Sequence, residues 1–256
     1  MKRHLAKPRT APALLAACLA LTGAAIAGDD VTQVHRERDL LVYQGPIEAS
    51  ANERAVALLG QGGVQRLRIA SPGGEIGLGM DLGELVRRHA LDVEVDGVCA
   101  SSCANYVFPA GARKLLAGDA VVIWHGSAIQ EDVGTAAMID FEEVARLRGR
   151  PLDEAGKAAM IEQFASYGRA MRERQAGYYA ALGLDARITV FGQDVGCDCD
   201  WTIPVEDMAR FGLRGVEAPQ GYGAALSSLP KPVAMLRLDD HPDYAAAVDA
   251  ARMHDE

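Results

Sequence analysis

Hydrophobic and polar positions between residues 39 and 124 follow two periods that alternate along the chain. Short apolar runs that end at Gly, Pro or Asp predict strands, and apolar residues three or four positions apart predict helices. The strands are expected at 39–44, 64–70, 91–95 and 120–124. The helices are expected at 48–59, 78–89 and 101–110. Strands and helices that alternate at this pace are typical of an α/β domain with parallel strand pairing.

The pattern changes after residue 130. Two long helical patterns span 136–148 and 152–182, and Gly183 follows the second as a helix-ending residue. The apolar run at 188–191 predicts a further strand, and residues 204–211 predict a short helix.

These segments suggest one domain rather than several. We assign residues 28–222 to an α/β domain with a helical insertion at about 131–186. Residues 223–256 are polar, with Pro230 and Pro232 near their start. We therefore expect them to form a C-terminal tail that lies loosely on the surface or is disordered.

The first 27 residues have the layout of a secretory signal peptide. Basic residues precede an almost wholly apolar run from Ala11 to Ala25, and Ala25-Ile26-Ala27 supplies a small-x-small cleavage site. Lipidation at Cys18 is the alternative, but it would leave only a short apolar run ahead of the cysteine. Cleavage after Ala27 therefore predicts a periplasmic or secreted protein, and cleavage at Cys18 a lipoprotein.

Four cysteines remain in the mature chain: Cys99, Cys103, Cys197 and Cys199. An even number in an oxidising compartment predicts disulfides. The spacings C-x3-C and C-x-C fit structural zinc sites poorly, so we expect no metal. The sequence does not choose among the possible pairings of these four cysteines, so all of them remain open.

The charge of the chain limits its partners. The formal net charge is −9, and no stretch after the N-terminus is strongly basic. Phosphate binding needs clustered Lys and Arg, so nucleic acid is not an expected partner.

Three segments could carry chemistry. The turn Ser71-Pro72-Gly73-Gly74 would let the backbone approach a ligand and present N–H groups to a negative charge. Ser101 and Ser102 stand where a helix is expected to begin, and His125 ends an apolar strand. Each segment alone has an ordinary structural explanation: a tight turn, a helix cap or a structural histidine.

In order and spacing, five segments together resemble the proteolytic subunit of Clp protease, a serine peptidase of the ClpP/crotonase superfamily. The matching segments are Leu41 to Pro46, Ile69 to Gly74, Gly97 to Gly111, Val122 to His125 and Asp200 to Leu213. The resemblance implies that superfamily's repeated β-β-α superhelix. It also implies a serine endopeptidase without a cofactor.

Carried over residue by residue, the resemblance implies a triad of Ser102, His125 and Asp200, with Gly73 and Cys103 as backbone donors of an oxyanion hole. Gap-free counting from Gly73 forward and from Gly111 backward selects Ser102, which leaves Ser101 as the alternative nucleophile.

The position of the acid has alternatives, because about 75 residues separate His125 from Asp200. Asp194 and Asp198 could take its place. The cysteine clusters flank both the serines and Asp200, so we expect at least one disulfide to join the two clusters.

The implied substrates are peptides or unfolded proteins, and a homo-oligomer is compatible with the family. An ATP-driven unfoldase is not expected in a compartment without ATP. A Ser/Lys dyad is the nearest rival, with Lys114, Lys157 and Lys231 as candidates. An acyl-CoA enzyme of the crotonase type and a catalytically silent binding or scaffold protein are two further functions that the same fold could carry.

Overall fold

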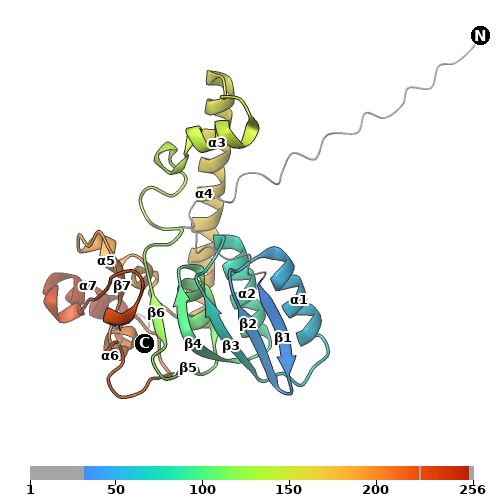
Figure 1. Ribbon diagram of the computed structural model, residues 1–256. Coiled ribbons are helices and arrows are strands. Elements are labelled where there is room, and N and C mark those ends of the chain that lie inside the picture. Colours follow the sequence, from blue (N-terminus) through green and yellow to red (C-terminus); the bar gives the residue numbers. More distant parts are fainter. Residues whose placement is uncertain (1–31, 225, 254–256) are drawn as a thin grey trace, which may run out of the picture.

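The computed structural model describes residues 32–224 and 226–253. The expected signal peptide and the alternative lipidation site at Cys18 lie outside these residues. The described chain is an α/β protein with a mixed sheet. Figure 1 shows a body, built around that sheet, and a helical projection that stands away from it.

The sheet has seven strands in the order β1-β2-β3-β4-β5-β8, with β6 paired to a second stretch of β4. Only β1 is antiparallel to its neighbour; the other pairs are parallel. The strands are β1 (Gln33–Glu37), β2 (Leu40–Gln44), β3 (Arg66–Ser71), β4 (Asp92–Ala100), β5 (Lys114–Leu116), β6 (Val121–Ile123) and β8 (Val216–Glu217). The predicted parallel pairing is thus confirmed.

The long strand β4 is shared between two partners. Its first half pairs with β5 and its second half with β6. The positive φ of Gly97 (+101°) lies between the two halves, and the register with β3 shifts in the same region. Such a bulge bends the strand and redirects its end.

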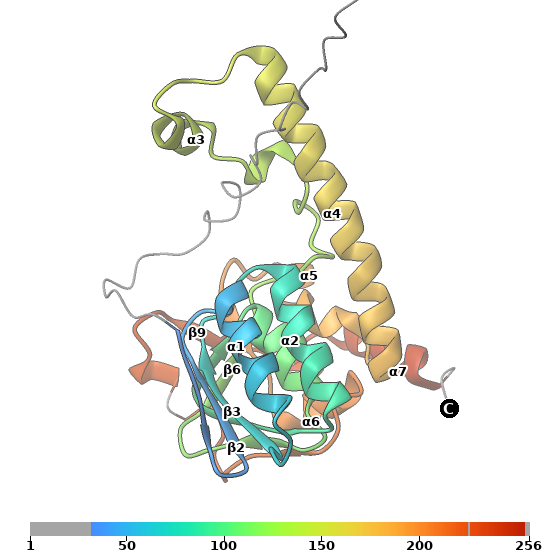
Figure 2. The same cartoon turned by 90° about the vertical axis from the view of Figure 1, so that its right-hand side faces the viewer.

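Two helices, α1 (Ala49–Leu59) and α2 (Ile76–Arg88), cover one face of the sheet, as Figure 2 shows. Alternate residues of the strands point at them: Leu41, Leu67, Ile69, Val93 and Val95 are all fully buried. This alternation is the period expected of a strand with one face in the core. The opposite positions of β3 and β4 carry Arg66, Arg68 and Glu94, joined by ion pairs.

After β4 the chain forms a π-helical segment (Cys103–Val107) and a 3-10 turn (Phe108–Ala110), where a regular helix was expected. Two helices follow β6, as predicted: α3 (Phe141–Arg148), preceded by a 3-10 turn (Ala136–Met138), and α4 (Glu154–Leu182).

Residues 136–167 form the projection, which we call the arm. Local signals define the two helices that contribute to it, α3 and α4. The side chain of Asp140 caps α3, that of Asp153 caps α4, and Gly149 and Gly183 end the two helices with left-handed backbones.

The strand expected at 188–191 is wrong. The chain there forms a 3-10 turn (Ala186–Thr189) and the short helix α5 (Phe191–Asp194). The Asp185 carboxylate accepts the Arg187 N–H (2.9 Å), and the Thr189 hydroxyl donates to the Ala186 carbonyl (2.7 Å). These local bonds satisfy the backbone without a partner strand.

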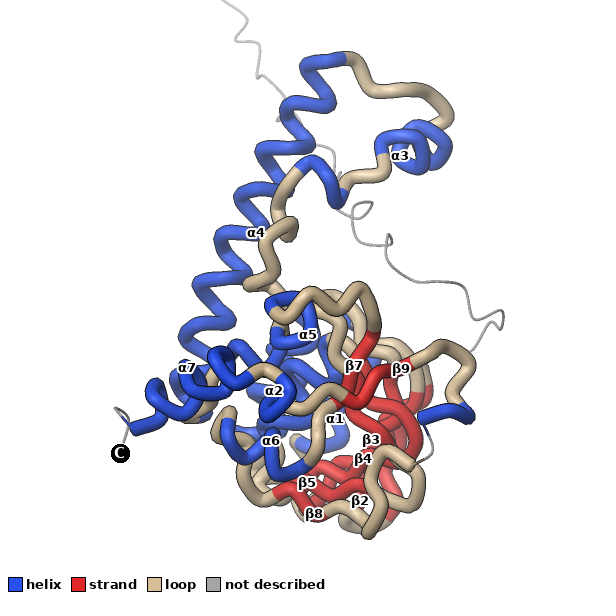
Figure 3. Tube along the Cα trace, turned by 90° about the vertical axis from the view of Figure 1, so that its left-hand side faces the viewer, coloured by secondary structure: helices blue, strands red, loops and turns tan. Residues whose placement is uncertain are grey.

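The expectation of a loose C-terminal tail is also wrong for the described part of that segment. Figure 3 shows a two-stranded sheet of β7 (Asp200–Thr202) and β9 (Val233–Met235) beside the main sheet. The chain then forms a 3-10 turn (Leu238–Asp240) and α7 (Pro242–Met253), which contacts α6 (Val205–Arg210). Leu238 and Val248 are fully buried, because the apolar positions between the polar ones pack inward.

Candidate functional site

Ser101 lies at the end of β4, where the chain turns into the π-helical segment. Its N–H donates to the Ile123 carbonyl (3.0 Å), which extends the β4–β6 pairing by one residue. Its φ of +55° lies in the left-handed region. Residues other than glycine adopt this conformation rarely, and those that do are often at functional sites. The side chain is partly exposed. A sharp turn between strand and helix is also the backbone that presents the nucleophile in many serine hydrolases.

The loop after β3 packs tightly against this turn. Gly73 has a φ of +97°, and a Cβ built on it would lie 2.7 Å from the Ser101 Cβ and 2.9 Å from the Ser102 nitrogen. Only glycine permits this approach. The Gly73 carbonyl accepts the Ile47 N–H (2.7 Å), and the Gly73 N–H donates to the Ser71 hydroxyl (3.1 Å). The Ser71 hydroxyl therefore occupies one of the two expected oxyanion donors.

Ser102 faces the interior. It is 2% exposed, and its hydroxyl donates to the Gly74 carbonyl (2.7 Å). A Cβ at Gly79 of α2 would lie 2.7 Å from the Ser102 Cβ, so the side chain fills space that the glycine leaves open. In this structure Ser102 fastens the Gly73-Gly74 turn to the serine segment, and Ser101 is the more exposed of the two.

Two backbone irregularities lie between the glycines used for counting and the two serines. Val95 pairs with Ile69 and Cys99 pairs with Ser71. Strand β4 therefore advances by four residues where β3 advances by two. Residues 103–107 are π-helical, and a π-turn takes up one residue more than an α-turn. Gap-free counting from Gly73 or from Gly111 takes neither irregularity into account.

His125 follows β6, the strand beside the second half of β4, and its side chain is exposed. The parallel register pairs Ala100 with Ile123, so Ser101 and His125 leave the same edge of the sheet. Figure 1 shows β4 running toward this edge, on the side from which the arm rises. The His125 carbonyl accepts the side-chain amide of Gln193 (3.3 Å).

Asp200 reaches the same edge through a cross-strand contact. Trp124 and Trp201 exchange both backbone hydrogen bonds (2.8 and 2.9 Å) in an antiparallel bridge. His125 follows Trp124 and Asp200 precedes Trp201, so the two residues flank this isolated antiparallel bridge on the same side. The bridge therefore brings the segments of the candidate base and the candidate acid to the same edge of the sheet.

No side-chain hydrogen bond joins Ser101, His125 and Asp200 in the described chain. Such bonds are often long before substrate binds. The alternative acids are placed differently. Asp194 accepts the Tyr244 hydroxyl (2.8 Å), and Asp198 is exposed. Neither is next to the Trp124–Trp201 bridge in sequence.

The cysteines pair within their clusters. Cys99 and Cys103 are fully buried with Cα atoms 5.2 Å apart, and Cys197 and Cys199 have Cα atoms 5.3 Å apart. Both pairs lie at disulfide distance. The expectation of a bond between the clusters is therefore wrong. The left-handed turn at Ser101 is what brings the first pair together, and two such pairs are consistent with an oxidising compartment.

The candidate lysines of a Ser/Lys dyad have other positions. Lys114 pairs with Val93 near the start of β4, at the opposite end of that strand from the serines. Its ammonium donates to the Gly111 carbonyl (2.8 Å), and burial lowers the pKa of Lys114. Lys157 belongs to the arm, and Lys231 is exposed.

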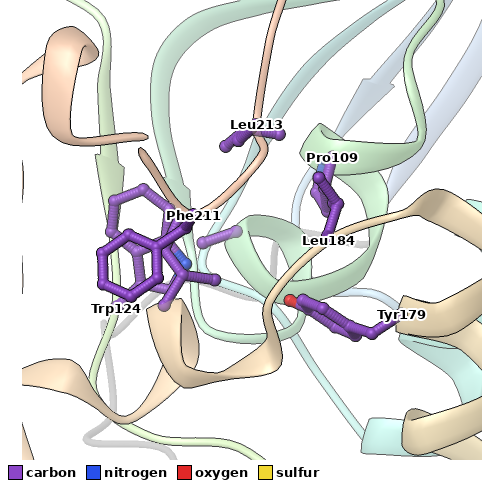
Figure 4. Close-up of a pocket in the computed structure, with 8 residues that line it drawn as sticks. Pro109, Trp124, Tyr179, Leu184, Phe211 and Leu213 are labelled. Atoms are coloured by element: carbon purple, nitrogen blue, oxygen red, sulfur yellow. The ribbon is translucent and has the colours of Figure 1, made fainter. Parts of the chain in front are cut away.

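Two hollows in the structure contain none of the candidate residues. Figure 4 shows the first, an apolar gap that is too small for a water molecule. It is lined by Ala104, Pro109, Trp124, Tyr179, Leu184, Ile188, Phe211 and Leu213. The second is a cleft of about 400 Å³ between the end of α4 and α7. The first is a packing gap beneath the site.

The part of the chain that the structure describes has no group of three His, Cys, Asp or Glu side chains suited to a metal ion. None of its helices is long and apolar enough to cross a membrane. Comparison with known proteins adds no assignment: no family model matches the chain, and no curated protein matches it.

Several residues that hold the site together have little or no signal in the sequence. The Gln193 amide contacts the His125 segment, and the Asn105 amide donates to the Gly126 carbonyl (2.8 Å). β9 pairs with β7, which positions Asp200 opposite Val233. Only the polarity of Asn105 within an apolar run could have marked it.

Proposed function

We propose that the protein is an exported serine hydrolase that cleaves peptides or unfolded proteins, with Ser101 as nucleophile, His125 as general base and Asp200 as the acid that orients His125. A ClpP-like fold and a periplasmic location belong to the same proposal. One observation carries it: Ser101 stands on a left-handed turn at the end of β4, and His125 follows the adjacent strand β6.

The chemistry follows from these positions. His125 would take the Ser101 hydroxyl proton as the oxygen attacks the substrate carbonyl carbon, and would give that proton to the leaving amine when the C–N bond breaks. A water molecule, activated in the same way, would then release the acyl group and restore the hydroxyl. Asp200 would hold the imidazole tautomer and stabilise its charged form.

With Ser101 as nucleophile, the oxyanion donors also move. In hydrolases of this kind one donor is the N–H of the residue after the nucleophile. That residue is Ser102, whose nitrogen faces Gly73 across the tight contact described above. The Gly73 N–H is the second donor once the Ser71 hydroxyl turns away from it. Loss of one such donor commonly costs about 3 kcal/mol in the barrier.

A silent binding or scaffold protein is the second candidate. Two observations favour it: the Ser71 hydroxyl holds the Gly73 N–H, and no hydrogen bond joins Ser101 to His125 in the described chain. A Ser/Lys dyad has less support, because Lys114 is at the far end of β4 and Lys157 is in the arm.

Hydrolysis of unstructured fluorogenic peptides by the chain from Gly28 onward tests the proposal. The wild type should cleave them, and His125→Ala should lower kcat by about 10⁴-fold or more. His35→Ala is the matched control, because His35 is an exposed histidine on β1. It should keep full activity. A wild-type protein that cleaves no peptide and reacts with no fluorophosphonate would instead support the scaffold.

A further inference from the structure

Asn105 connects the two segments that carry the proposed nucleophile and base. Its backbone N–H donates to the Ser101 carbonyl (2.8 Å). Its side-chain amide donates to the carbonyl of Gly126 (2.8 Å), the residue after His125. The residue is 2% exposed, so water competes little for either bond.

The hydrogen bond from the Asn105 amide restrains the backbone at Gly126, where the absence of a side chain permits many conformations. Gly126 has a φ of +124°, in the region that glycine occupies without strain. The direction in which the chain leaves His125 therefore depends on hydrogen bonds. The only other side-chain bond to the His125-Gly126 pair among the described residues is that from Gln193, which is longer (3.3 Å) and exposed.

Packing stability does not explain an asparagine at this position. The Oδ1 atom of Asn105 is buried and has no hydrogen-bond partner within the described structure. A buried acceptor without a partner is destabilising, and an apolar side chain of the same size would avoid it. The Tyr179 hydroxyl donates to the backbone carbonyl of Asn105 (2.7 Å), so α4 holds this residue in place without the amide. What the amide adds is the bond to Gly126.

We propose that Asn105 is a positioning residue that sets the place of the His125 imidazole relative to the Ser101 hydroxyl. The inference rests on the proposed function, since it assigns Asn105 a part in the same site. Misplacement of a catalytic group by about 1 Å can cost about 100-fold in rate. The effect of Asn105 should therefore fall on kcat.

Two variants test it. Asn105→Leu keeps the size of the side chain and removes both polar atoms. Asn105→Asp keeps the shape, but its carboxylate cannot donate to Gly126. With a fluorogenic peptide, kcat should fall about 10- to 100-fold for both variants, while KM changes less than about twofold.

The matched control is Asn52→Leu, because Asn52 is also a buried asparagine whose amide donates to a backbone carbonyl, that of Leu78 (2.9 Å). It should lower the melting temperature and leave kcat of the folded protein unchanged. A merely structural role for Asn105 predicts the same pattern for Asn105→Leu.

A second readout does not depend on hydrolysis. The imidazole NMR signals of His125 should shift or broaden in both Asn105 variants and remain unchanged in Asn52→Leu. If wild type is inactive but these signals shift, the proposed function fails while the positioning contact stands. If both Asn105 variants keep kcat within twofold of wild type, or if the His125 signals do not move, the positioning role is wrong.

Discussion

Different interactions stabilise the two regions of the molecule that we compare, the sheet edge at Ser101 and the arm. At the edge, Cys99, Cys103 and Tyr106 are fully buried, and side chains from distant segments bond to its backbone. In the arm, α3 has no fully buried residue, and its caps and ion pairs join near neighbours in sequence.

The difference shows where geometry is determined. Long-range packing and buried hydrogen bonds fix the candidate site in one arrangement. The arm depends on helix signals worth about 1 kcal/mol each, such as the Asp153 cap. Substitutions at the edge should therefore change catalysis or global stability strongly, and equivalent substitutions in the arm should change little.

Asp200→Asn should give the largest effect. An amide in place of the carboxylate would favour the wrong imidazole tautomer, so kcat for peptide hydrolysis should fall by about 10⁴-fold. The matching change in the arm, Asp153→Asn, keeps a good helix cap and should leave kcat unchanged. Asp198→Asn controls for charge near the site. Equal losses in Asp200→Asn and Asp198→Asn would remove Asp200 from the proposed triad.

Trp201→Ala should come next, through stability. Trp201 is 1% exposed and opposes Trp124, and Phe/Trp→Ala in a core costs about 3–5 kcal/mol. Leu147 in the arm is 63% exposed, so Leu147→Ala should change the free energy of unfolding by less than about 0.5 kcal/mol. Urea unfolding measures both. A large loss in Leu147→Ala would show that the arm is packed against something in solution.

Tyr167→Phe tests the contact between the two regions and should have the smallest effect. The Tyr167 hydroxyl at the base of the arm donates to the carboxylate of Glu75, which follows the Gly73-Gly74 turn and caps α2. Removing a hydrogen bond to a charged group costs about 1.5 kcal/mol. The variant should be destabilised by about that amount near pH 7, as measured by urea unfolding.

The same bond predicts a pH dependence. Burial first, and then the bond to Glu75, raises the pKa of Tyr167. The folded state then holds the phenol proton more tightly than the unfolded state, whose tyrosines titrate near about 10. The contribution is therefore complete below about pH 10 and is lost as the pH rises above it. The stability difference between wild type and Tyr167→Phe should shrink over this range, and a constant difference would contradict the raised pKa.

The sequence predicted the strands and helices whose apolar period decides their structure. α1, α2, β3 and the long helix α4 lie within a few residues of their expected bounds, because each buries one regular face or carries its own caps. β7 was missed, because a three-residue strand exists only through its pairing with β9 and with Trp124. The β-branched run at 188–191 misled in the opposite direction, since local hydrogen bonds outweighed its strand propensity.

For the candidate site as well, the sequence indicates some features and only the folded backbone shows the others. The motifs place His125 and the Gly73 loop after strands, and in the structure both segments lie at one sheet edge because those strands are parallel to β4. Our proposal of Ser101 rather than Ser102 rests on the backbone conformation at Ser101. No residue pattern shows in advance that β4 carries a bulge or that residues 103–107 are π-helical.

The serine that reacts with a fluorophosphonate reveals whether the left-handed turn presents the nucleophile, and peptide mass mapping of wild type, Ser101→Ala and Ser102→Ala identifies it. We expect an adduct on Ser101 in wild type and no labelling in Ser101→Ala. Ser102→Ala should still label on Ser101, at a rate reduced only as far as loss of the Ser102 bond to Gly74 loosens the turn. An adduct on Ser102, or labelling that survives in Ser101→Ala and disappears in Ser102→Ala, would contradict Ser101 as the nucleophile.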